Sequence, residues 1–329
     1  MQTAAASLRA SAPPQAARVR FRPAARALGF HPVLAGLLAL QALVLLFNVL
    51  SFRWAGLHFV AEGGGAAIAG LAFILALWAY FVAYPGRNPK EWVIGETFLA
   101  VALFLLLGAL LGPAQYGGAA LNRPYVDSAL AAADAAMGVN VSALAEWTRH
   151  YPLLVTVLVR SYFTLLPQFF LPFVVLGFIC RDRRALWEYV ALMHLAAFIT
   201  VVCFALWPAA CAPQFYGFDP VGIDQSRVFR HLAGLRGGTM TTVVVGDLDG
   251  LVSAPSFHVL GAMCVTWAFR RRSWCLVPLL VVDLLLAAAT VMTGVHYAVD
   301  VVAAFAIFPC LVWLYRRVEH AIDPVAARA

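Results

Sequence analysis

The stretch SAPSFH, residues 253–258, opens an apolar run in the last third of the chain, and TGVHYAVD, residues 293–300, opens a second one. A basic turn, Arg270–Arg272, lies between the two runs. Two membrane-spanning helices joined by a hairpin bring their far ends to the same side of a bilayer. The sequence therefore predicts that His258 and His296 meet at one membrane face, near the water boundary.

An aspartate follows the second histidine at a spacing that suits catalysis. His296 and Asp300 are four residues apart, which would place them on one face of a helix. A carboxylate there can orient an imidazole ring and hold its proton. We therefore expect phosphoryl-transfer chemistry on a lipid, with His296 as the nucleophile, Asp300 orienting it, and His258 as general acid and base. Ser256 is expected to help bind the phosphate. The alternative to this catalytic interpretation is that both histidines are interfacial packing residues.

These motifs resemble those of the type 2 phosphatidic acid phosphatase superfamily, most closely the branch that includes inositol phosphorylceramide synthase. The family's Pro-Ser-x-His motif matches residues 255–258, and its His-Tyr-x-x-Asp motif matches residues 296–300. In layout the resemblance covers residues 93–316. It implies a six-helix phosphatase-like core, metal-independent phosphohydrolase or phosphotransferase activity on a lipid phosphate, and a substrate-binding role for Tyr297.

Two departures from the family pattern concern the phosphate-binding arginines. Ala289 and Thr290 stand where many relatives have a Ser-Arg pair, and no Lys precedes Arg123 at the family's spacing. The charge that binds phosphate must then come from elsewhere. Arg236 is the main candidate, since it precedes two glycines in the loop that leads to residues 253–258.

Alternatives remain for each candidate arginine. Arg236 could instead pair with Asp247 or Asp249 of the same loop. Arg230 is a weaker candidate from that loop. Arg160 lies inside an apolar run next to residues typical of a broken helix, and it could reach the phosphate or pair with Asp283 in another span.

The composition defines the class of protein. The chain of 329 residues is 63% hydrophobic and only 12% charged, whereas soluble domains have about 25% charged residues. The predicted fold is all-α, a polytopic membrane helix bundle of about eight transmembrane helices. The expected spans are residues 32–52, 66–84, 93–111, 151–179, 188–207, 255–269, 275–292 and 297–315.

The net charge of +7 follows membrane topology. The arginines of the chain lie in short runs between apolar segments, which argues against a nucleic-acid partner. By the positive-inside rule, the same distribution puts both termini in the cytoplasm and both histidine motifs outside. The six cysteines form no CxxC or CxxH motif, so no metal site, disulfide framework or cofactor is expected.

The predicted organisation has four parts. These are a disordered cytoplasmic tail, two accessory transmembrane helices, the phosphatase-like core and a short cytoplasmic tail, at residues 1–30, 31–92, 93–316 and 317–329. The expected location is the bacterial inner membrane, with the site facing the periplasm or exterior.

Within the core, the outer loop 112–150 predicts an Ala-rich helix with Asp127 near its N-cap and Gly138 as its stop. Asp127 and Asp134 are candidate head-group ligands; the alternative is a cap and a solvated face.

Three functions fit these features. Water as acceptor gives a lipid phosphatase, and an alcohol or lipid acceptor gives a head-group phosphotransferase. The third is a non-enzymatic lipid carrier or flippase. The expected partners are the membrane and a lipid phosphate or phospholipid substrate.

Overall fold

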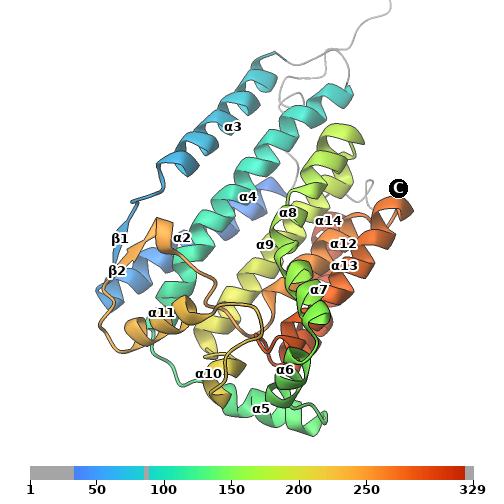
Figure 1. The fold of residues 1–329 in the computed structure, drawn as a ribbon. Coiled ribbons are helices and arrows are strands. Elements are labelled where there is room, and N and C mark those ends of the chain that lie inside the picture. The colour runs from blue at the N-terminus through green and yellow to red at the C-terminus, as the bar shows by residue number, and fades with distance from the viewer. Residues whose placement is uncertain (1–32, 85–88, 323–329) are drawn as a thin grey trace, which may run out of the picture. The chain divides into compact units, whose positions relative to one another are not determined.

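The structure, a computed structural model, describes residues 33–84 and 89–322 (Figure 1). The predicted tail at residues 1–30 and most of the C-terminal tail, residues 323–329, lie outside the described residues. Within them, seven helices or broken helices are long and apolar enough to cross a membrane, which confirms the all-α polytopic bundle. These are α2 (Leu34–Ala55), α3 (Gly65–Ala83), α4 (Pro89–Ala120), the broken span 152–179, α9 (Arg183–Leu206), α13 (Ser273–Met292) and α14 (Ala298–Ile322).

The span predicted at residues 255–269 is a shorter helix than expected. It is α12 (Phe257–Ala268), which has 12 residues and is therefore about 18 Å long, whereas a bilayer core is about 30 Å thick. Its N-terminus thus starts partway down the bundle, after a segment without regular secondary structure at residues 248–256. The run at residues 255–269 is the shortest of the eight predicted spans, and the residues that the structure describes show no helical extension of it on the outer side, so the motif SAPSFH is recessed.

The fourth span is broken, as its sequence predicts. Pro167 and Pro172 remove two backbone N–H donors from the helix. Between these prolines, the carbonyl oxygen of Phe169 accepts a hydrogen bond from the hydroxyl of Tyr189 at 2.7 Å. Three pieces result: α7 (Pro152–Phe163), α8 (Leu165–Gln168) and a π-helical turn, η1 (Phe173–Ile179). The break lets the aromatic side chains at the α7–α8 junction approach α12.

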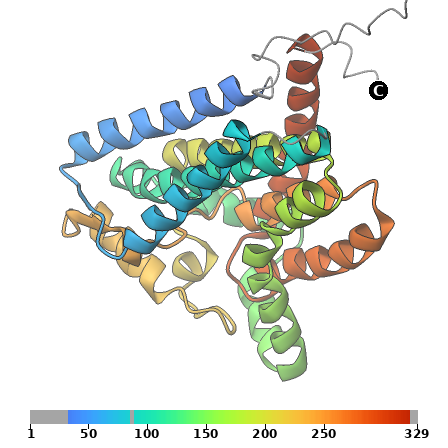
Figure 2. The same cartoon turned by 90° about the horizontal axis from the view of Figure 1, so that it is seen from above.

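The core of the bundle surrounds α9, which packs against α4 and α12. Trp187, Tyr189 and Leu192 of α9 are fully buried there. In contrast, α3 has no buried residue and packs chiefly on α4; α2 lies at the edge of the bundle (Figure 2). The two N-terminal helices therefore add to the periphery and leave the C-terminal helices to form the site.

Short elements gather at one end of the bundle (Figure 1). They are α5 (Asp127–Ala136), α6 (Val141–Arg149), α10 (Ala212–Tyr216), α11 (Ser226–Arg236), η2 (Val245–Asp247) and the strands β1 (His58–Val60) and β2 (Thr242–Val244). The strands pair in parallel, with His58 opposite Thr242. This pairing ties the loop after α2 to the loop that precedes α12.

Ion pairs fix the opposite end of the bundle. Arg270 contacts Glu188 at 2.7 Å and Arg272 contacts Asp182 at 2.6 Å. Burial alone would raise the pKa of Asp182, but the hydrogen bonds from Arg272 and from the N–H of Ala185 hold that pKa below its ordinary value. Because this basic turn follows α12, both histidine motifs lie at the other end, as predicted.

Candidate active site

His296 lies in the tight turn between α13 and α14. Its N–H donates to the carbonyl oxygen of Thr290 at 2.9 Å, and the turn depends on Gly294, which has φ +86°. A Cβ at Gly294 would lie 2.5 Å from the ring of Phe218, so only glycine fits there. The helix begins at Ala298, two residues after His296, so His296 precedes α14 instead of lying on it.

Asp300 still reaches the histidine from the first turn of α14. Its Oδ2 lies 3.4 Å from His296 Nδ1 and accepts hydrogen bonds from Ser253 Oγ and from the N–H of Tyr297, each at 3.2 Å. A carboxylate that accepts the N–H three residues before it closes the helix start as in a capping box. Asp300 therefore both starts α14 and orients the imidazole ring.

His258 faces His296 from the start of α12. The two ring centroids are 5.8 Å apart, and the His258 ring stacks on Tyr162 of α7 at 4.2 Å. Ser256 is the N-cap of α12, and its Oγ lies 3.5 Å from both Val259 N and His296 Nε2. No described residue hydrogen-bonds to the His258 ring, which leaves its nitrogens available to a ligand.

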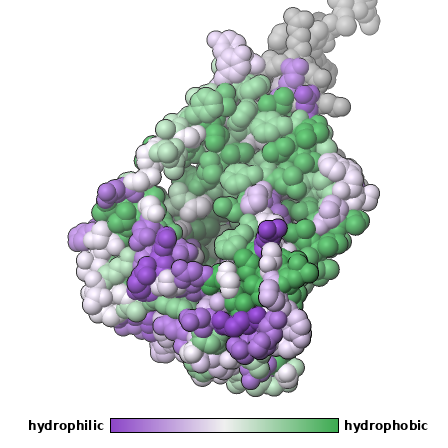
Figure 3. Space-filling view, in the orientation of Figure 1, coloured by the Kyte–Doolittle hydropathy of each residue, from purple (hydrophilic) through white to green (hydrophobic). Residues whose placement is uncertain are grey.

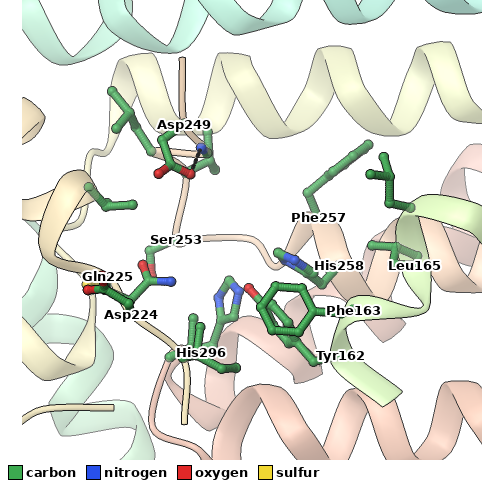
Figure 4. A pocket seen from close by; sticks show the side chains of 18 of the residues that line it. Tyr162, Phe163, Leu165, Asp224, Gln225, Asp249, Ser253, Phe257, His258 and His296 are labelled. Carbon is green, nitrogen blue, oxygen red and sulfur yellow. Dashed lines mark hydrogen bonds between the residues drawn. The ribbon is translucent and has the colours of Figure 1, made fainter. Parts of the chain in front are cut away.

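A cavity of about 460 Å³ lies over the two histidines. The close-up shows His258 and His296 at its centre (Figure 4). In the space-filling view the face of Figure 1 is hollowed between a hydrophilic region at the loop end and apolar side chains elsewhere (Figure 3). Cys211 also lines the cavity, but burial raises the pKa of its thiol to about 12. The thiol therefore stays protonated, and the histidines are the available nucleophiles.

A family model described as PAP2 superfamily matches residues 128–314, more than half of the chain. The chain belongs to the PAP2 superfamily. No curated protein and no solved structure matches it. The matched region contains both histidine motifs, Asp300 and every residue that lines the cavity. The superfamily and the seven apolar spans together make this chain an integral membrane protein of a class that acts on lipid phosphates.

The arginines predicted to bind phosphate in this PAP2 protein do not line the cavity. Arg236 donates to the carbonyl oxygen of Arg123 at 2.9 Å, and its guanidinium lies 3.8 Å from the ring centroid of Tyr125. Arg230 and Arg160 are exposed. Phosphate binding by these three arginines stays a prediction, which the contacts of Arg236 with Arg123 and Tyr125 do not favour.

The alternatives proposed for these arginines also differ from what is observed. Asp247 and Asp249 pair with Arg227 instead of Arg236, at 3.5 and 3.8 Å. Asp283 is hydrogen-bonded to Thr266 of α12, not to Arg160. These pairings could not be predicted from the residue pattern, because they depend on how the loops fold back on the helices.

The cavity lining does not include Asp127, Asp134 or Tyr297, whose hydrogen bonds hold the turn that carries His296. Asp134 accepts the N–H groups of Ala298 and Val299 at 2.9 and 2.8 Å, and so caps α14 from α5. Asp127 accepts the Tyr297 hydroxyl at 2.9 Å, and Tyr297 is fully buried. These contacts position the turn that carries His296, and substrate binding by the three residues stays a prediction.

Three residues of the site were not predicted. Tyr162 stacks on His258, Ser253 donates to Asp300, and Asp224 lines the cavity wall. Ser253 lies inside the first motif, so its position was a usable signal. Tyr162 and Asp224 come from segments whose approach to the motifs depends on the broken span and on the loop fold.

Proposed function

We propose that this chain is a phosphoryl-transfer enzyme that breaks a phosphate ester of a membrane lipid through a phosphohistidine at His296. The observation that supports this most is the pair of histidine rings 5.8 Å apart, with Asp300 behind only one of them. An imidazole that has a carboxylate at Nδ1 is the better nucleophile, because the carboxylate stabilises the ring as it becomes charged. His258, which lacks a carboxylate partner among the described residues, is suited to proton transfer.

The proposed reaction has two steps. His296 Nε2 attacks phosphorus while His258 protonates the departing oxygen; His258 then removes a proton from the acceptor, whose oxygen attacks the phosphohistidine. Proton transfer of this kind contributes about 10²–10⁴-fold to a rate. The negative charge that develops on the phosphoryl oxygens would be stabilised by Ser256 and by the free N–H groups at the start of α12.

The proposed site faces outward. Arg181, Arg183, Arg184 and the basic turn 270–272 all lie at the end opposite the histidines. Positively charged loops remain in the cytoplasm, so the cavity would open to the periplasm or exterior. A reporter that is active only outside the cytoplasm should give signal when inserted at Gly238 and none when fused after Ala329; the reverse pattern refutes this orientation.

The first step is common to two reactions, which differ in the acceptor. One is hydrolysis, and the other is head-group transfer to an alcohol, as in the inositol phosphorylceramide synthase-like branch. Purified protein incubated with a lipid carrying labelled phosphate, with and without a lipid alcohol, should release phosphate in the first case and form labelled phospholipid in the second. His296→Ala should abolish both products. Turnover of more than a few per cent by a folded His296→Ala protein would refute the proposal.

A further inference from the structure

The cavity over the histidines has two unlike walls. The loops at residues 224–225 and 249–253 form one wall, which carries Asp224 and Asp249. The α7–α8 junction forms the other, where Phe163 and Leu166 line the cavity and are still 60% and 68% exposed. In Figure 4 the histidines lie between Asp224 and Asp249 on one side and Phe163 and Leu165 on the other. A ligand that fills this cavity must be polar at one end and apolar at the other.

The polar wall carries negative charge without a matching positive charge inside. Among the described residues that line the cavity there is no Lys or Arg. Arg227 approaches Asp249 from outside, with Nε 3.8 Å from Oδ2, and both side chains are well exposed, so the pair is weak. Hydrogen bonds from Ser226 hold the pKa of Asp224 below its ordinary value, and the charges of Arg230 and Arg227 act in the same direction. Asp224 therefore stays ionised at neutral pH.

The histidine pair points independently to a ligand at this place. His296 is 2% exposed yet lines the cavity, and the His258 ring has no hydrogen-bond partner among the described residues. A phosphate monoester would bring close to two negative charges at pH 7 to a wall that already carries two carboxylates. A phosphodiester brings one negative charge, and a cationic head group would offset the carboxylates.

Building on the proposed function, we propose that the donor substrate is a phosphodiester lipid whose head group carries an ammonium. The ammonium lies against Asp224 and Asp249, the phosphorus lies at His296, and the acyl chains lie along Phe163 and Leu166 toward the bilayer. In Figure 4 His258 is on the same side as Leu165, which puts the general acid next to the oxygen that leads to the acyl chains.

The reaction balances in this orientation. His296 Nε2 forms a bond to phosphorus as the bond from phosphorus to the glycerol oxygen breaks, and His258 gives its proton to that oxygen. Diacylglycerol leaves, and the phosphohistidine retains the ammonium head group as an ester. An acceptor hydroxyl, or water, then loses its proton to His258, its oxygen bonds to phosphorus, and the bond from phosphorus to nitrogen breaks.

The test compares four diacyl lipids with the same acyl chains and one common product, diacylglycerol. Two are phosphodiesters with choline and ethanolamine head groups, one is a phosphodiester with an uncharged glycerol head group, and one is phosphatidic acid. We expect kcat/KM to be at least about tenfold higher for the ammonium lipids than for either other lipid. Equal or faster turnover of phosphatidic acid or of the glycerol lipid overturns the inference and leaves the proposed function intact.

Charge variants locate the preference on the polar wall. Asp224→Asn and Asp249→Asn should each lower the ammonium preference by about two- to fivefold, on the scale of an exposed ion pair, with little change for the glycerol lipid. Asp219→Asn is the matched control, because Asp219 is exposed on the same loop and does not line the cavity. An unchanged preference in the Asp224→Asn, Asp249→Asn double variant contradicts the assignment.

Equilibrium binding of the same four lipids to the His296→Ala protein separates the two proposals. If the ammonium lipids bind most tightly and no lipid is turned over by the wild-type protein, the proposed function fails and the head-group inference stands. If all four lipids bind equally, the inference fails whatever the activity.

Discussion

Asp300→Asn isolates the charge behind the nucleophile, since asparagine keeps the size of the side chain and an oxygen that can accept from Ser253 and from the N–H of Tyr297. Two unit charges 3.4 Å apart, the distance from Asp300 Oδ2 to His296 Nδ1, interact by about 5 kcal/mol at an effective dielectric constant near 20. Only the part of this interaction that develops as the His296 ring becomes cationic lowers the activation barrier. The separation is also longer than the 2.7–2.9 Å of a strong charge-assisted bond.

We therefore expect Asp300→Asn to lose roughly 3–4 kcal/mol of transition-state stabilisation, or about 10²–10³-fold in kcat. Asp134→Asn is the matched control, because Asp134 caps the same helix without contacting His296. That change should lower the free energy of unfolding by about 1 kcal/mol and leave kcat within a few-fold of wild type. The assay is single-turnover release of diacylglycerol, with thermal unfolding measured in parallel. A fall of less than tenfold for Asp300→Asn, or equal falls for both variants, would refute the reasoning.

The other predictions concern proton transfer, phosphate binding, the turn and pH. His258→Ala should keep measurable turnover of an activated phosphate ester while losing turnover of a lipid, because a good leaving group needs no acid; equal loss on both contradicts this role. Arg236→Ala should keep kcat within about threefold, since its guanidinium contacts Arg123 and not the cavity; a hundredfold loss would restore it to phosphate binding. Gly294→Ala should lose most activity through a displaced His296 while the apolar spans still insert, which circular dichroism and activity together measure. The low pKa of Asp182 implies stability that is present above its unfolded value of about 3.9 and is lost as pH falls through the lower folded value. Removing its partner should therefore lower the unfolding temperature more at pH 6 than at pH 3, and an equal loss at both pH values would argue against the pair.

The sequence predicted the spans well because bilayer crossing imposes one strong rule on length and polarity. Six of the eight expected spans correspond to continuous apolar helices, with ends shifted by up to nine residues, and the fourth broke near its prolines as predicted. The predicted run at residues 255–269 corresponds to α12, which is shorter than the other spans because a helix that starts inside a bundle needs less apolar length than one that crosses the bilayer. Hydropathy does not distinguish a recessed start from a short span.

The histidine pair was predictable because two ordered motifs at the ends of a helical hairpin can only meet at one face. The contacts of the loop arginines were not. Arg236 could have pointed anywhere from its glycine-flanked position, and its actual partners, Arg123 and Tyr125, come from a loop more than one hundred residues earlier. Likewise, Asp134 resembled a ligand because its real partners are backbone N–H groups at the start of a distant helix, which side-chain patterns do not reveal.

The most direct test of the account is detection of a phosphohistidine on the nucleophile. Purified protein mixed with labelled lipid and quenched within one turnover should carry an acid-labile, base-stable phosphoryl group, which mass spectrometry of peptides should place on His296. The label should be absent in His296→Ala. A label on His258, or turnover without any label on the protein, would contradict the central claim.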